Sequence, residues 1–284
     1  MNYRHAYHAG NFSDVFKHAV LALVLEHLKA KPVPFHVLDT HAGIGRYDLA
    51  AAQATKTGEW RDGIARVLAA ADRLPEELAP YLDAVRAMQI EGSPDGLRWY
   101  PGSPRIARHL MRPEDRMTLV ELHPEDAEVL KAEFARDRQV AVHRMDGYQA
   151  LKAHLPPREK RGLVLVDPPF ETPDEFARMA EGLAMAHRRW AVGIKALWYP
   201  IKERPAVWRF QEAVAATGVP KILVAELTVH AEDTHTRLNG CGMLIANPPW
   251  RLDETLGRVL PALHAALGAE AGAARVDWLV PEGA

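Results

Sequence analysis

The stretch of the sequence with the most specific chemical potential is Asp167-Pro168-Pro169-Phe170, which follows the apolar run 163–166. A short, fully apolar run is typical of a buried parallel strand, and in an open α/β sheet ligands bind at the carboxyl ends of such strands. Proline has no N–H, so the backbone of Pro168 and Pro169 offers carbonyl groups without competing donors. A carboxylate and a carbonyl together suit a planar amino group with two hydrogens, and Phe170 could stack on the ring that carries this group.

This arrangement meets the requirement for methylating an exocyclic amine, whose lone pair is delocalised into its ring. Hydrogen bonds from the amine to Asp167 and to a proline carbonyl favour a pyramidal nitrogen and free the lone pair for in-line attack on a methyl sulfonium. The four residues resemble the [Asp/Asn/Ser]-Pro-Pro-[Tyr/Phe/Trp] motif of S-adenosylmethionine-dependent amino-methyltransferases. A turn that only ends a strand is the alternative interpretation of Asp-Pro-Pro, so other parts of the chain must discriminate.

Three further acidic residues end predicted strands earlier in the chain. Asp39 precedes a glycine-containing loop at 40–45, Glu121 stands where an acid can bind two ribose hydroxyls, and Asp146 could accept a hydrogen bond from an adenine amino group. Each acid alone could simply complement a helix N-terminus. Together they favour a nucleoside-binding edge, and the absence of a full Gly-x-Gly-x-x-Gly pattern disfavours a nicotinamide cofactor.

The order of predicted elements indicates an α/β fold with additions. Apolar residues at helical spacing predict a helix over 12–28, and the alanine-rich stretch 47–97 is too long for one crossover connection, so we expect an inserted helical subdomain there. Ser103 is a candidate N-cap for the helix that follows. The last predicted strands, 221–229 and 241–246, are joined by a loop, which predicts an antiparallel pair at one edge of the sheet.

A second candidate motif, Asn247-Pro248-Pro249-Trp250, also fits the amine-methylating pattern. It follows a late strand that we expect to be antiparallel, whereas Asp167 follows the strand-terminal acids after one crossover. This topology favours Asp167 and indicates that 247–250 is a strand exit.

Composition limits the class of protein. The chain has 284 residues, 48% hydrophobic and 25% charged, and a net charge of −2, which is ordinary for a globular protein and gives no support for nucleic-acid binding. One cysteine, Cys241, excludes an internal disulfide, and the sequence shows no secretory or membrane-spanning segment, so we expect a cytoplasmic protein. His5 and His8 lack a third nearby ligand, so we expect no metal site.

With these motifs placed, the whole chain resembles the bacterial J-type family of large-subunit ribosomal RNA adenine-N6 methyltransferases (RlmJ family), which act on 23S rRNA. The matching stretches are Tyr3-Arg4-His5, His8-Ala9-Gly10-Asn11, Asp14-Val15, Lys17-His18, Leu38-Asp39-Thr40-His41-Ala42-Gly43, Tyr100-Pro101-Gly102-Ser103-Pro104, Glu121-Leu122-His123-Pro124, Asp146-Gly147, Asp167-Pro168-Pro169, Ala196-Leu197-Trp198-Tyr199-Pro200 and Trp278-Leu279-Val280-Pro281. The N-terminal segment and the Leu-Asp-Thr-His loop are not general methyltransferase features, so the match is specific.

The resemblance implies a single Rossmann-like, S-adenosylmethionine-dependent methyltransferase domain over 1–284, with a cofactor- and substrate-binding segment at 1–30. It implies that Asp167, Pro168 and Phe170 are catalytic and that Tyr3 contacts the RNA with His5 nearby. The implied cofactor-binding residues are Lys17, His18, His41, Ser103, Glu121, Asp146, Gly147 and Asp167. The family motif usually ends in tyrosine, and the phenylalanine found here keeps stacking but lacks the phenol hydroxyl. The target base would have to be flipped out of its stack.

Three other functions share parts of this pattern. A DNA adenine-N6 methyltransferase would use the same chemistry at the amine, and only the docking surface would differ. A protein-glutamine methyltransferase would present a similar planar amide but favours asparagine in the motif, as at Asn247. An RNA-binding module with a relic pocket is disfavoured because Glu121, Asp146 and Asp167 are all present. We expect a monomer, since nothing in the sequence indicates an interface.

Overall fold

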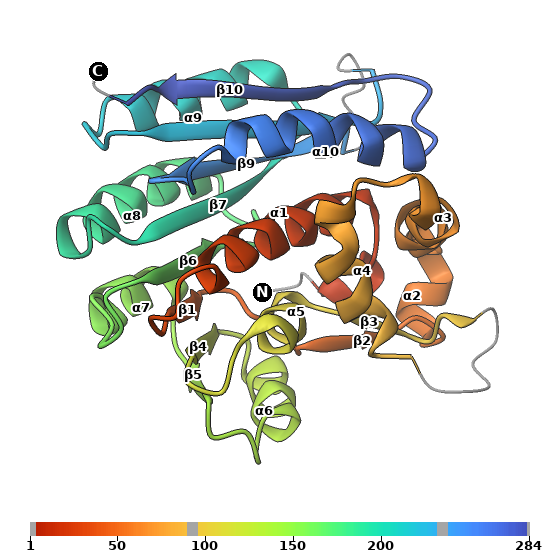
Figure 1. The fold of residues 1–284 in the computed structure, drawn as a ribbon, viewed down its shortest axis with the longest axis horizontal. Helices are drawn as coiled ribbons and strands as arrows, with labels where there is room; N and C mark the ends of the chain where they lie inside the picture. The colour runs from red at the N-terminus through yellow and green to blue at the C-terminus, as the bar shows by residue number, and fades with distance from the viewer. Residues whose placement is uncertain (1–3, 90–95, 232–237, 283–284) are drawn as a thin grey trace.

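The computed structural model describes residues 4–89, 96–231 and 238–282, and one eight-stranded sheet forms its centre (Figure 1). The strand order is β10-β8-β9-β7-β6-β1-β4-β5. The five neighbouring strands from β7 to β5 are parallel, and β9, β8 and β10 extend the sheet by antiparallel pairing. The strands are β1 (His36–Asp39), β4 (Arg116–Glu121), β5 (Val140–Arg144), β6 (Gly162–Val166), β7 (Ile194–Ile201), β8 (Ile222–Thr228), β9 (Gly240–Ala246) and β10 (Ala274–Val280).

Helices cover both faces of the sheet, which explains why β6 is apolar at every position. Leu163 and Leu165 pack into the core on one face, and Val164 and Val166 pack into the core on the other, because successive side chains of a strand alternate. The first face carries α1 (Phe12–Lys29), α5 (Ser103–Leu110) and α10 (Leu252–Ala266), and the second carries α7 (Gly147–His154), α8 (Glu175–Arg189) and α9 (Arg204–Ala215). Helix α6 (Pro124–Glu133) packs against β4 and β5. The result is a Rossmann-like α/β/α sandwich.

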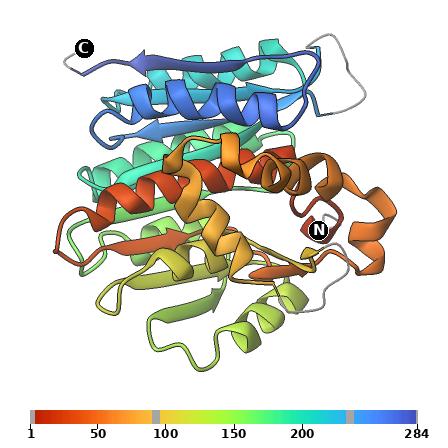
Figure 2. The same ribbon diagram turned by 45° about the vertical axis from the view of Figure 1, so that its right-hand side comes forward.

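Helix α1 crosses the middle of the first face and is almost entirely buried (Figure 2). It begins after Asn11, whose side-chain oxygen accepts hydrogen bonds from the backbone N–H groups of Ser13 and Asp14. Its apolar residues explain most of this burial, but Asp14, Lys17 and His18 are buried as well. A charged pair inside a central helix is unusual and requires partners.

The segment that we expected to be a helical insertion lies between two short strands, β2 (Arg46–Asp48) and β3 (Trp99–Pro101). These strands pair antiparallel, so the two ends of the segment lie together. Its helices are α2 (Ala52–Thr57), α3 (Arg66–Ala69) and α4 (Ala79–Arg86), joined by short helical turns. Contacts of α4 and of the turn at Arg61–Ala65 with α1 attach the segment to the main fold beside the beginning of α1 (Figure 2).

Most element predictions are confirmed, and two are wrong in detail. The helix predicted over 12–28 is α1, and the late strands are β8 and β9, which are antiparallel as expected. The pair is not at the edge of the sheet, because β10 adds a further strand outside β8. Ser103 is not the N-cap of α5: Gly102 occupies that position, and the Ser103 hydroxyl is used elsewhere. None of the helices in the described ranges has both the length and the apolar character needed to span a membrane.

Candidate active site

The four strand-terminal acids lie side by side at the carboxyl ends of the parallel strands, and we call this end of the sheet the carboxyl edge. Asp39 ends β1, Glu121 ends β4, Asp146 follows β5 and Asp167 follows β6. These strands are parallel neighbours in the order β5-β4-β1-β6, so their carboxyl ends face the same side. The edge predicted from the sequence is therefore present, as expected for a ligand site in an α/β sheet.

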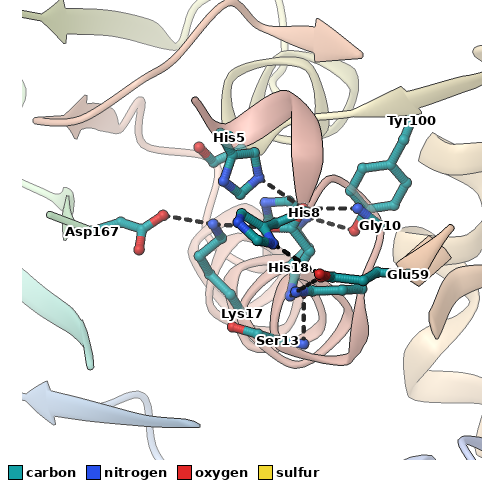
Figure 3. A network of polar contacts seen from close by, with 12 residues as sticks. His5, His8, Gly10, Ser13, Lys17, His18, Glu59, Tyr100 and Asp167 are labelled. Atoms are coloured by element: carbon teal, nitrogen blue, oxygen red, sulfur yellow. Dashed lines mark hydrogen bonds and ion pairs between the residues drawn. The ribbon is translucent and has the colours of Figure 1, made fainter. Parts of the chain in front are cut away.

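Asp167 is held by a chain of charged groups that originates in α1 (Figure 3). The Lys17 ammonium donates to Asp167 Oδ2 at 2.5 Å and lies 2.9 Å from Asp14 Oδ1. The other Asp14 oxygen is 2.9 Å from Nε2 of His5 and accepts from the backbone N–H of Gly10 at 2.9 Å. One lysine thus bridges two carboxylates and connects the Asp-Pro-Pro-Phe motif to the N-terminal turn.

The charges of these neighbouring groups fix the ionisation of Asp14 and Lys17. Burial alone would raise the pKa of Asp14, but the nearby His5 ring and Lys17 ammonium hold that pKa well below its usual range. Burial alone would lower the pKa of Lys17, yet Asp14 and Asp167 hold it well above its usual range. Lys17 is therefore a permanent cation beside Asp167. Sequence analysis assigned Asp14 no role, although its i, i+3 spacing to Lys17 in an apolar helix was a usable signal.

The Asp39 carboxylate is stabilised by hydrogen bonds from neutral donors, which are weaker than the contact of Asp167 with the Lys17 ammonium. Ser103 Oγ donates to its Oδ2 at 2.6 Å, and the backbone N–H of His41 donates to Oδ1 at 3.2 Å. Burial raises the pKa of Asp39 to about 6, with the Asp167 carboxylate adding to the rise. Burial also lowers the pKa of His41 to about 4, so this imidazole is neutral at pH 7. The Ser103 hydroxyl thus supports the site through Asp39 instead of capping a helix.

Glu121 and Gly147 shape the part of the edge beside β4 and β5. The two oxygens of Glu121 accept from the backbone N–H groups of Gly43 at 2.9 Å and His123 at 2.7 Å. Burial raises the pKa of Glu121, and these two hydrogen bonds oppose the rise. A Cβ atom at Gly147 would lie 2.6 Å from the Thr40 carbonyl oxygen, so only glycine lets α7 begin this close to the loop after β1.

Asp146 has a structural function in addition to any ligand contact. Its Oδ1 accepts from the backbone N–H groups of Tyr148 and Gln149, which caps α7, and its Oδ2 accepts from Arg178 at 3.0 Å. The helix-cap interpretation that we considered for each acid is thus correct for this one. A ligand at Asp146 would share a carboxylate that is already engaged.

The aromatic residue of the motif adopts a strained backbone conformation. Phe170 has φ of 52°, in the left-handed region that non-glycine residues rarely adopt. Its ring meets Phe176 edge-on at a centroid distance of 5.0 Å and Trp198 at 6.0 Å. These contacts fix the half-buried ring at the exit of β6, next to Asp167.

His18 lies behind the charged chain and has one unused nitrogen. Its Nδ1 is 2.7 Å from the Tyr100 hydroxyl, which is in turn 3.1 Å from the Tyr81 hydroxyl. Burial lowers the pKa of His18 well below its usual range, so the ring is neutral. Its buried Nε2 has no hydrogen-bond partner within the described residues. Such an atom is the kind of group that a bound ligand can satisfy.

The N-terminal segment folds across this edge. Arg4 pairs with Asp126 on α6 at 2.6 Å, and His8 Nδ1 lies 3.0 Å from Glu59 in the helical segment between β2 and β3. His5 reaches the charged chain through Asp14, and its ring centroid is 5.0 Å from that of Tyr47. Tyr3, predicted to contact RNA, lies outside the described residues. Among the described residues no cluster of three or more potential ligands could hold a metal ion.

The rival motif Asn247-Pro248-Pro249-Trp250 leaves the sheet at the opposite end of the strands from Asp167. β9 is antiparallel to β7, and Ala246 pairs with Lys195 near the beginning of β7. Asn247 therefore emerges where the parallel strands begin, whereas Asp167 emerges where they end. The topological argument that separated the two motifs is confirmed.

Comparison with known proteins identifies the family. The family model described as "Ribosomal RNA large subunit methyltransferase D, RlmJ" matches residues 32–280. Ribosomal RNA large subunit methyltransferase J of Escherichia coli is 46% identical over 99% of this chain and 100% of its own length, and that of Haemophilus influenzae is 42% identical with the same coverage. The chain belongs to the RlmJ family. It is therefore a methyltransferase, and the resemblance read from its motifs is confirmed.

The RlmJ fold is also found in a solved structure. Protein LPL1258 from Legionella pneumophila superposes with a TM-score of 0.88 at 30% identity, covering 95% of this chain and 98% of that one. Within this fold, the predicted site residues that the structure describes come from separate stretches of the sequence and lie near the carboxyl ends of the parallel strands. Asp14, which the sequence patterns did not indicate, connects Lys17 to His5 in this RlmJ chain.

Proposed function

We propose that the protein transfers a methyl group from S-adenosylmethionine to the exocyclic N6 amine of an adenine in 23S ribosomal RNA. The observation that carries the proposal is the Asp167 carboxylate at the carboxyl end of β6, fixed on one oxygen by Lys17. The carbonyl groups of Pro168 and Pro169, which follow Asp167 in the chain, would supply further acceptors. This is the acceptor-only environment that a planar amino group requires.

The residues along the edge fit S-adenosylmethionine. Glu121 offers carboxylate lone pairs suited to a ribose diol, and Asp146 offers an acceptor for an adenine amino group. The Nε2 atom of His18, buried without a partner in the described structure, offers one more polar contact. When bound, the cofactor would supply an electrophilic methyl group. His41, Ser103 and Gly147 would line the same site, because His41 and Ser103 donate hydrogen bonds to Asp39 and Gly147 lies against His41.

Asp167 would act by orienting the amine. Hydrogen bonds from both N–H groups, to Asp167 and to the Pro168 carbonyl, would localise the nitrogen lone pair perpendicular to the base. An aromatic amine is far too weak an acid for a carboxylate to deprotonate beforehand, so the proton would leave after methyl transfer. The ring of Phe170 would stack on the flipped base.

Lys17 would be a positioning residue. Its ammonium holds Asp167 Oδ2 and is itself held by Asp14, so the carboxylate keeps one orientation while its other oxygen faces the substrate. A fixed acceptor needs no reorganisation during the reaction, which is the main source of electrostatic catalysis.

A DNA adenine-N6 methyltransferase is the alternative that shares this chemistry. The family description and the names of both relatives specify ribosomal RNA of the large subunit, which favours RNA. Action on ribosomal RNA would also agree with the cytoplasmic location expected from the sequence.

Methyl transfer to defined acceptors tests the proposal. Tritiated S-adenosylmethionine would be incubated with protein-free 23S rRNA, with large ribosomal subunits and with duplex DNA, using the wild type and Asp167→Ala. We expect label in RNA, recovered as N6-methyladenosine and lost in Asp167→Ala. Label in DNA alone would support the alternative, and label unchanged by the substitution would refute the function assigned to Asp167.

A further inference from the structure

A pocket lies at the end of the sheet opposite to Asp167, where the parallel strands begin. It has a volume of about 220 Å³, several times the ~30 Å³ occupied by one water molecule in the liquid. Its walls come from the end of α1, the beginnings of β6 and β7, and the Asn247-Pro248-Pro249-Trp250 exit of β9. The motif that resembles an amine-methylating sequence but stands at the wrong edge therefore lines a pocket of its own.

The charged side chains that line this pocket are all basic or potentially basic. His27 lies in the last turn of α1, Lys31 follows this helix and Arg161 precedes β6, and none of the lining residues is acidic. Burial lowers the pKa of His27, and the nearby Arg161 and Lys31 charges lower it further, so the imidazole is neutral near pH 7 and the positive field of the pocket comes from Lys31 and Arg161. Such a field suits an anion, and a phosphate diester has the required charge.

Trp250 presents an aromatic surface at the mouth of the pocket. Its side chain is 79% exposed, the largest exposed fraction among the large hydrophobic residues of the described chain. The loop that carries it is fixed: the Asn247 side-chain amide donates to the Val192 carbonyl at 2.7 Å, and the Asn247 backbone N–H donates to the Lys221 carbonyl at 2.9 Å. Asn247 and Arg251, on either side, both have positive φ, of 54° and 59°. The loop backbone on both sides of the exposed Trp250 side chain thus adopts strained conformations.

An exposed aromatic ring that lines one pocket with two cations is the combination that binds single-stranded nucleic acid, by base stacking and by phosphate contact. We propose that this pocket is a second RNA-binding site, which takes an unpaired nucleotide of the RNA substrate with its base on Trp250 and its phosphate on Lys31 and Arg161. The inference rests on the proposed action on ribosomal RNA. β6 has five residues and spans roughly 16 Å, so one RNA molecule could reach both edges of the sheet.

Equilibrium binding to protein-free 23S rRNA, together with methylation kinetics, tests this site. We expect Trp250→Ala to weaken RNA binding about tenfold, the effect of losing one base–aromatic stack, and to raise KM for RNA in parallel while kcat at saturating RNA is unchanged. Trp208→Ala is the matched control, because Trp208 is 54% exposed on α9 and does not line the pocket. Trp208→Ala should bind like the wild type.

The contribution of Lys31 and Arg161 can be measured separately, from the salt dependence of RNA binding. Lys31→Gln and Arg161→Gln should each reduce the slope of log K against log salt by about 0.7, the contribution of one phosphate contact in a single strand. Binding by Trp250→Ala within twofold of the wild type, or salt slopes unchanged in both basic variants, would overturn the second site. A defect seen with ribosomal particles but absent with free RNA would also overturn it and would indicate a protein partner at the pocket. If the wild type methylates no RNA, the proposed function is wrong. The RNA-binding measurements on the Trp250, Lys31 and Arg161 variants would still test the second RNA-binding site.

Discussion

The unusual carboxyl group of Asp39 leads to a quantitative prediction about stability and pH. Burial moves its pKa from 3.8 to about 6, which corresponds to about 3 kcal/mol because each pH unit is worth about 1.4 kcal/mol. The folded pKa is higher than the unfolded pKa, so the unfolded chain loses this proton first as the pH rises. Between about pH 4 and pH 6 the folded protein binds the extra proton, and stability must fall with rising pH before it becomes constant.

Asp39→Asn removes this titration while keeping a side chain of the same shape. Any change in stability that the substitution causes through the Ser103 and His41 hydrogen bonds does not depend on the Asp39 proton. We therefore expect the difference in unfolding free energy, variant minus wild type, to be about 2 kcal/mol more positive at pH 7 than at pH 4. This comparison cancels the titration of groups that both proteins share.

Urea unfolding followed by far-ultraviolet circular dichroism at several pH values between 4 and 7 would measure the difference. The control is Asp72→Asn, because Asp72 is exposed. The difference in unfolding free energy between this variant and the wild type should stay constant from pH 4 to pH 7. Asp115→Asn would not serve as a control, because Asp115 accepts a hydrogen bond from the backbone N–H of Phe35. A difference for Asp39→Asn that stays within about 0.5 kcal/mol across this range, or that reverses sign, would refute the assignment of a raised pKa to Asp39.

Three further substitutions test the site. Lys17→Met leaves the buried Asp14 and the partly buried Asp167 without their cation, so we expect a loss of about 3–5 kcal/mol in urea unfolding and loss of methyl transfer. Lys131→Met, which removes an exposed ion pair, should cost less than about 1 kcal/mol. Gly147→Ala places a Cβ 2.6 Å from a carbonyl oxygen, so isothermal titration should show weakened S-adenosylmethionine binding, while Gly257→Ala, with open space around it, should bind normally. Phe170→Leu should lower kcat/KM for RNA about tenfold through lost stacking, and Phe170→Tyr should retain activity; equal activities of the two variants would contradict a stacking function.

The sequence was sufficient to predict the edge of the sheet at which the acids meet. Apolar runs that end in Asp39, Glu121 and Asp167 could be assigned to parallel strands, and parallel strands bring their carboxyl ends to one side. The separation of Asp167 from Asn247 followed from the same reasoning, because an antiparallel strand exits at the other edge. These predictions depended on strand direction alone, which the order of the elements determines.

Contacts that depend on packing could not be predicted in this way. Ser103 stands where serine commonly caps a helix, but the neighbouring glycine fills that position and the hydroxyl turns to Asp39. The position of β10 outside β8 required long-range pairing that no local pattern encodes. The function of Asp14 was missed because its partner Lys17 also pairs with Asp167, 150 positions further along the chain, and only the folded chain shows that one ammonium serves both carboxylates.

The position of β1 in the sheet has a consequence for synthesis of the chain. β1 has β4 and β6 as neighbours, and their pairing joins His36 to Arg116 and to Gly162. A growing chain therefore leaves one side of β1 unpaired, beside the largely apolar α1, until β6 has been made more than a hundred residues later. Closing such long loops is slow, because the entropy of closure is lost before the non-local contacts form. The early product is a segment that must stay unpaired and unaggregated on the translating ribosome until its partners arrive.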